Sequence, residues 1–102
     1  MTLTPQETKA QALSKIKTSL RIVTNAFDDE LSDLIDAAQL DLAIAGVNNT
    51  DLTDALVLRA ITTYCRMHFG EPDQYDRLKK SYDEQKAQLC TATGYTNWTS
   101  EG

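Results

Sequence analysis

The spacing of hydrophobic positions between Leu52 and Phe69 predicts a helix that is buried on most of its sides. With successive residues about 100° apart, the segment leaves one narrow polar stripe, formed by Arg59, Thr62, Thr63 and Arg66. Apolar residues cover the remaining arc of roughly 220°, whereas a surface helix of a small bundle needs an arc nearer to about 100°. We therefore expect a central helix over residues 52–69 with other helices around it.

Three further helices are predicted around this central one. Residues 4–7 have the Thr-Pro-Gln-Glu order of a capping box, followed by apolar positions at helical spacing as far as about Leu20. A second helix starts within residues 25–28 and ends at Gly46, which suits a left-handed terminal position. Sparse apolar positions over residues 72–92 predict a fourth helix at the periphery of the core.

Two local interactions are also expected from spacing. Asp51 or Thr53 is placed to cap the central helix. In the fourth helix, Asp73 and Arg77 are four residues apart in the favourable order for an ion pair.

These elements predict an all-α fold, a small four-helix domain over residues 1–92 followed by an extended aromatic tail over residues 93–102. At 102 residues the chain makes one domain that is marginal alone and gains from oligomerisation. The chain has no apolar run long enough for a secretory signal or a membrane span, so we expect neither. Two cysteines, Cys65 and Cys90, fit a reduced intracellular protein best, and a disulfide between them is left open.

The net charge of −5 is unevenly distributed. Residues 1–21 carry +3, residues 22–58 carry −8 with no Lys or Arg, and residues 59–102 are neutral. A protein that holds DNA by its phosphates has a basic face instead. If the central helix were the recognition helix of a helix-turn-helix, the acidic segment before it would repel the backbone.

Candidate catalytic and metal-binding residues are few. Cys65 and His68 are three residues apart on the central helix and could approach one metal ion, but two more ligands would be needed, and a core histidine is the more ordinary reading of His68. The chain has one histidine and no nucleophile or phosphate-loop motif. We expect no catalysis, no metal and no cofactor.

The chain resembles the small helical head–tail connector (adaptor) proteins of long-tailed double-stranded-DNA phages, also known as DNA-packaging proteins. The resemblance covers residues 13–98 and includes LSKIKTSLRI and DDELSDLIDAA, which are generic helical patterns. The more specific parts are ALVLRAITTYCRMHFGEPDQYDRL and SYDEQKAQLCTATGYTNW, which resembles the C-terminal part of the family in phages of Gram-positive bacteria.

This resemblance implies a structural protein of the virion neck, assembled in the host cytoplasm. It implies a dodecameric ring of identical subunits beneath the portal, joined to a head-completion (stopper) or tail-side neck protein, with double-stranded DNA passing through without specific binding. Gly94, Tyr95 and Trp98 match the tail of the family, and we expect them to contact the portal or a neighbouring subunit. Judged from the residue types alone, Tyr95 and Trp98 are equally consistent with packing on the helices of their own subunit and with contact to a neighbouring protein.

Two more sets of residues are candidates for this role. Tyr75 and Tyr82 belong to the fourth helix, whose sparse apolar positions suggest that another surface covers it, so we expect them at the partner interface. Because an acidic lumen lets a duplex slide, we expect the cluster at the start of the second helix to line the channel. The cluster consists of Asp28, Asp29, Glu30, Asp33 and Asp36. The alternative function is a small phage regulatory protein that binds DNA or a host protein.

Overall fold

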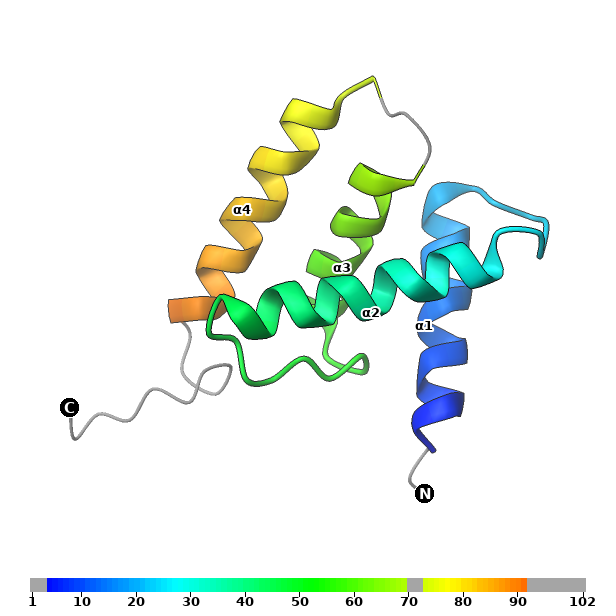
Figure 1. The fold of residues 1–102 in the computed structure, drawn as a ribbon, viewed down its shortest axis with the longest axis horizontal. Coiled ribbons are helices and arrows are strands. Elements are labelled where there is room, and N and C mark those ends of the chain that lie inside the picture. Colours follow the sequence, from blue (N-terminus) through cyan, green and yellow to red (C-terminus); the bar gives the residue numbers. More distant parts are fainter. Residues whose placement is uncertain (1–3, 70–72, 92–102) are drawn as a thin grey trace.

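Four helices follow one another along the chain and are joined by short loops (Figure 1). They are α1 (Pro5–Leu20), α2 (Asp28–Ile44), α3 (Ala55–His68) and α4 (Tyr75–Thr91). The structure is a computed structural model, and it describes residues 4–69 and 73–91. The predicted all-α fold is confirmed, and each helix lies within a few residues of its expected position.

Helix α3 contacts each of the other three helices. Helix α2 crosses α1 and α3 on one side, and α4 runs alongside α3 (Figure 1). The centre of the core is made by residues of α3 and α2 that are fully buried, namely Val57, Ala60, Ile61, Cys65, Ile35, Ala38 and Leu42. The apolar arc of α3 is narrower than its sequence predicts, because Leu56 and His68 are exposed.

The helix ends show how local chemistry fixes the boundaries. Thr4 and Glu7 form the expected capping box, in which Thr4 Oγ1 accepts from Glu7 N at 3.1 Å and Glu7 Oε1 accepts from Thr4 N at 3.0 Å. Gly46 has a φ of 107°, as its position after α2 predicts. The cap of α3 is Asp54, whose carboxylate accepts from the backbone N–H groups of the first turn.

The expectation that Asp51 or Thr53 caps α3 is therefore wrong. Asp51 Oδ1 accepts from Thr53 N and Thr53 Oγ1, at 2.9 and 2.8 Å, and so closes the turn before the helix. Leu52, which lies between these two residues in the sequence, is buried, so its side chain joins the core immediately before α3.

Helix α4 is less peripheral than its sequence predicts. Tyr82 and Leu89 are only 2 % and 1 % exposed, and both belong to the core. Among the residues that the structure describes, the expected ion pair between Asp73 and Arg77 does not form, because α4 begins at Tyr75 and leaves Asp73 outside it. No helix in the described ranges combines the length and the hydropathy that a membrane span requires.

Candidate functional site

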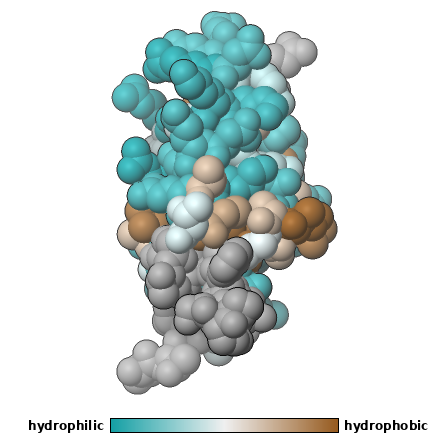
Figure 2. Space-filling view, turned by 90° about the vertical axis from the view of Figure 1, so that its left-hand side faces the viewer, coloured by the Kyte–Doolittle hydropathy of each residue, from teal (hydrophilic) through white to brown (hydrophobic). Residues whose placement is uncertain are grey.

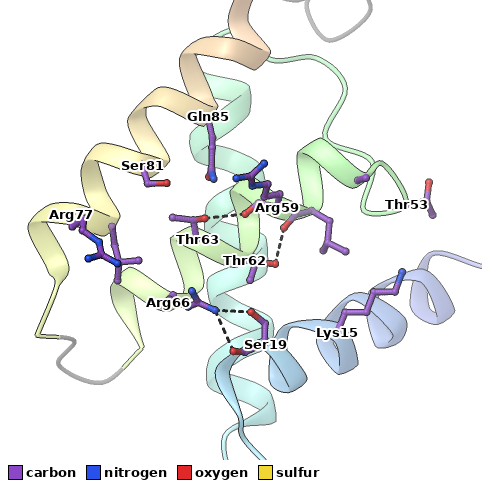
Figure 3. A pocket seen from close by; sticks show the side chains of 13 residues that line it. Lys15, Ser19, Thr53, Arg59, Thr62, Thr63, Arg66, Arg77, Ser81 and Gln85 are labelled. Atoms are coloured by element: carbon purple, nitrogen blue, oxygen red, sulfur yellow. Dashed lines mark hydrogen bonds between the residues drawn. The ribbon is translucent and has the colours of Figure 1, made fainter.

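The polar stripe of α3 forms the floor of a groove of about 580 Å³. Helix α1 lies along one side of the groove, α4 lies along the other, and α2 is behind α3 in the view into it (Figure 3). The four residues of the stripe, Arg59, Thr62, Thr63 and Arg66, all line the groove. The stripe is thus the exposed floor between two flanking helices.

The groove is strongly basic although the chain as a whole is acidic. It is lined by four cationic side chains, Lys15, Arg59, Arg66 and Arg77, and by no Asp or Glu. Arg66 Nη2 donates to the backbone oxygen of Ser19 at 3.2 Å and to its Oγ at 2.7 Å, which links α3 to α1 (Figure 3). Within residues 4–69 and 73–91, the other three cations form no ion pair. They can therefore take an anionic group from outside the subunit.

Uncharged polar side chains complete the groove. The hydroxyls of Thr62 and Thr63 donate to backbone oxygens one turn earlier in α3, at 2.8 and 3.1 Å. Gln85 extends from α4 toward Arg59 (Figure 3), and its buried Oε1 has no hydrogen-bond partner among the described residues. An acceptor that is buried without a partner destabilises the fold, because its lost hydration is not replaced.

The acidic cluster at the start of α2 divides into paired and unpaired carboxylates. Asp28 Oδ1 lies 2.8 Å from Lys17 Nζ, and Asp36 Oδ1 lies 2.7 Å from Lys9 Nζ, so both acids are partly neutralised by α1. The remaining three, Asp29, Glu30 and Asp33, are exposed and have no ion-pair partner in the described part of the chain.

The outer face of α2, which we define as Asp29, Asp33, Asp36, Leu40 and Ile44, is turned away from the core. At about 100° per residue these five positions lie opposite the buried residues of the same helix. The face is acidic in its first half and apolar in its second, where Leu40 and Ile44 are 61 % and 77 % exposed. A band of hydrophobic surface also crosses the side of the molecule shown in Figure 2, below a hydrophilic region. Apolar side chains as exposed as these favour contact with another protein.

The two tyrosines expected at a partner interface have different environments. Tyr75 is 38 % exposed, and its ring lies against that of His68, with 6.1 Å between the centroids. Tyr82 is instead buried in its own subunit, where its ring is 5.3 Å from that of Tyr64. A buried ring has no surface to offer a partner, so only Tyr75 remains an interface candidate of this pair.

The hydroxyl of Tyr82 joins α4 to α2. It donates to Asp41 Oδ2 at 2.5 Å, and Lys86 Nζ lies 3.3 Å from the same oxygen. Burial and the adjacent Asp41 carboxylate raise the pKa of Tyr82. Partial burial by itself raises the pKa of Asp41, but the hydrogen bonds from Tyr82 and Lys86 outweigh it and hold that pKa below its ordinary value. This contact stabilises the fold by joining α4 to α2 within the subunit.

The surroundings of Cys65 and His68 do not favour a shared metal ion. Cys65 is fully buried, and burial raises the pKa of its thiol to about 12, so the metal-binding thiolate is disfavoured. The expectation that His68 lies in the core is wrong, since it is exposed beside Tyr64 and Tyr75. In the described part of the chain, no three His, Cys, Asp or Glu side chains gather closely enough to hold a metal ion.

Three of the expected interface residues, Gly94, Tyr95 and Trp98, lie outside the described residues. The groove supplies residues that sequence reasoning missed. Lys15 and Arg77 come from helices on either side of α3, and only the arrangement of the helices brings them beside Arg59 and Arg66. The available signal was the polar stripe of α3 itself, which marked the side that no helix covers.

Comparison with known proteins gives one assignment. Residues 12–96 match the family described as phage connector protein, a structural family of phages. No curated protein and no solved structure matches the chain. Since the matched segment covers most of the chain, the chain belongs to the phage connector protein family.

Proposed function

We propose that this chain is the head–tail connector (adaptor) subunit of a tailed phage. It forms a dodecameric ring beneath the portal, joins the capsid to a stopper or tail-side neck protein, and leaves a central channel for DNA. The observation that carries this proposal is the match to the connector family over residues 12–96. Its role is structural, without a cofactor or a catalytic step, and its place is the virion neck after assembly in the host cytoplasm.

Two surfaces of the subunit support assembly into a larger structure. The outer face of α2 exposes Leu40 and Ile44, and the groove holds cations without ion-pair partners among the described residues. Exposed apolar side chains and unpaired cations are unfavourable in an isolated subunit. In a ring, a neighbouring subunit covers the apolar side chains and neutralises the charges. Tyr75 of α4 and Gly94, Tyr95 and Trp98 of the tail are proposed contacts with the portal or an adjacent subunit.

The start of α2 is the proposed wall of the DNA channel. Asp29 and Glu30 lie in its first turn, are exposed, and have no ion-pair partner in the described ranges. Asp28 contributes less charge because Lys17 pairs with it. Carboxylates at this position repel phosphates and keep the duplex free to move during packaging and ejection.

The cationic groove favours a second candidate function, a regulatory protein that binds DNA. Arg, Lys, Ser and Thr side chains are the usual partners of phosphate oxygens, and the groove contains all four types. A mobility-shift assay at low salt separates the two functions. Tight binding that is lost at high salt supports the regulator, whereas a connector ring leaves the duplex unbound or weakly bound.

A genetic experiment tests the connector function directly. A stop codon in the gene should give capsids that package DNA but carry no tails, and supplying the protein from a plasmid should restore tailed particles. A stop codon in an unrelated non-structural gene is the control. Normal tailed virions that lack the protein would refute the proposal.

A further inference from the structure

We propose that the cationic groove on α3 receives the part of the outer face of α2 from Asp33 to Ile44, contributed by a second copy of this chain. The inference rests on the proposed ring, and it names the contact that joins one subunit to the next. The acceptor is the groove between α1 and α4, and the donor is the acidic and apolar face from Asp33 to Ile44.

The two surfaces lie on opposite sides of one subunit. Helix α2 packs against one side of α3, and the groove opens on the other side (Figures 1 and 3). The outer face of α2 points away from α3, because the buried residues of α2 occupy its inner face. A contact between opposite sides of identical subunits is head to tail, and such contacts close into rings when the rotation between subunits allows it.

The charges of the two surfaces are complementary. The groove presents Lys15, Arg59 and Arg77 without ion-pair partners in the described ranges, and the donor face presents Asp33 without one. Asp36 pairs with Lys9 within the subunit, but its side chain is still 60 % exposed and can be shared with a second cation. Each surface alone carries one sign of charge, so the wrong pairings, groove to groove or face to face, repel.

The apolar residues match as well. Leu58 and Leu78 line the groove and are only partly covered by the core. Leu40 and Ile44 follow the carboxylates along the donor helix and remain exposed in one subunit. Burying these side chains against each other removes apolar area from water, while the cations that line the groove meet Asp33 and Asp36.

A second copy fits the groove better than duplex DNA does. DNA must approach a chain with a net charge of −5, and its phosphates gain nothing from Leu58 or Leu78. The α2 face offers both carboxylates and apolar side chains on one rigid helix. This arrangement assigns Asp33 and Asp36 to the subunit interface and leaves Asp29 and Glu30 for the channel.

Charge exchange between the two surfaces tests the inference. The groove variant is Arg59→Glu with Arg77→Glu, and the face variant is Asp33→Lys with Asp36→Lys. Each is the full chain, and ring formation on the purified portal of the same phage is followed by electron microscopy and sedimentation. We expect each variant alone to need at least about tenfold more protein to form rings, because like charges then face each other.

An equimolar mixture of the two variants should regain ring formation, since each altered face then meets an altered groove. The matched control is Lys79→Glu with Lys80→Glu, which makes the same change in net charge on α4 outside the groove. This control should assemble like the wild type. Arg59→Gln with Arg77→Gln removes charge without adding repulsion and should give an intermediate loss if the reversed pair fails to fold.

The outcomes separate the inference from the function on which it rests. A groove variant that forms rings at wild-type concentrations, or a mixture that fails to regain them, overturns the inference while the connector function stands. A groove variant that assembles normally but loses affinity for duplex DNA identifies DNA as the occupant instead. A wild-type chain that neither binds the portal nor forms rings overturns both.

Discussion

The hydroxyl of Tyr82 makes a side-chain hydrogen bond that joins α4 to α2. Its acceptor, Asp41, lies 41 positions earlier in the chain, and Lys86 approaches the same carboxylate from the next turn of α4. Hydrogen bonds to charged groups are stronger than neutral ones, and the buried Tyr82 ring fixes this one in place. The contact therefore joins α4 to α2, while α4 packs along α3.

Replacing Tyr82 by Phe should destabilise the subunit by about 1–2 kcal/mol. The ring stays in the core, while Asp41 loses a donor and keeps Lys86. Urea unfolding followed by circular dichroism measures the change. Tyr75→Phe, at an exposed tyrosine of the same helix, is the control and should cost less than about 0.5 kcal/mol. Equal stabilities for the two variants would contradict the role of the hydroxyl.

The same contact predicts a dependence of stability on pH. The pKa of Asp41 is below its ordinary value of 3.8, so its contribution is present above about pH 4 and is lost as pH falls through the folded value. The pKa of Tyr82 is above its ordinary value of 10.0, so its contribution is present below about pH 10 and is lost as pH rises beyond that. The free energy of unfolding, measured across pH, should fall on both sides. Asp41→Asn should reduce the loss of stability at acid pH, and Tyr82→Phe should reduce the loss at alkaline pH. If the free energy of unfolding of both variants varied with pH as in the wild type, the proposed role of this contact would be wrong.

Asp54 caps the start of α3, and replacing it should lower the stability of the subunit. Its carboxylate accepts from Leu56 N at 2.9 Å and from Val57 N at 3.2 Å. Asp54→Ala should cost about 1 kcal/mol in urea unfolding, the usual price of a lost cap. Thr53→Ala, at the cap expected from spacing, should cost less than about 0.5 kcal/mol. If Thr53→Ala lowered the free energy of unfolding more than Asp54→Ala does, Thr53 and not Asp54 would be the residue that caps α3.

At the scale of the helix, α2 has two faces with different tasks. Its inner face packs Leu31, Ile35, Ala38 and Leu42 against the core, and all four are fully buried. Its outer face leaves Ile44 77 % exposed. The fold of one subunit needs only the inner face, and we propose that the outer face serves assembly.

Two isoleucines of α2 separate these tasks. Ile35→Ala removes buried methyl groups and should cost about 2–5 kcal/mol in unfolding free energy. Ile44→Ala should leave the subunit within about 0.5 kcal/mol of the wild type and should weaken ring formation on the portal. A subunit strongly destabilised by Ile44→Ala, measured in the same urea titration, would place that side chain in the core.

Much of each helix could be predicted because local signals agree with the fold. The capping box at Thr4 and Glu7 and the left-handed Gly46 are short-range features, and both have the expected geometry. The burial of Tyr82 could not be predicted, since it depends on Asp41 in a distant helix. The apolar arc of α3 indicated burial on most sides but not which neighbour covers which side.

At the scale of the whole subunit, two of the four cationic residues that line the groove could be predicted from the sequence. Arg59 and Arg66 belong to a stripe that the periodicity of α3 identifies, whereas Lys15 and Arg77 join it only because α1 and α4 flank α3. The result is a subunit with a basic groove on one side and an acidic, apolar helix face on the other. Identical subunits with two such sides can be joined in a closed ring.

The most direct test of the connector account is electron cryomicroscopy of the full chain mixed with the portal of the same phage. The account predicts a dodecameric ring coaxial with the portal, with the start of α2 at the channel. The outer face of α2 from Asp33 to Ile44 of each subunit should lie in the groove of the next. Subunits that stay monomeric and leave the portal bare would contradict it.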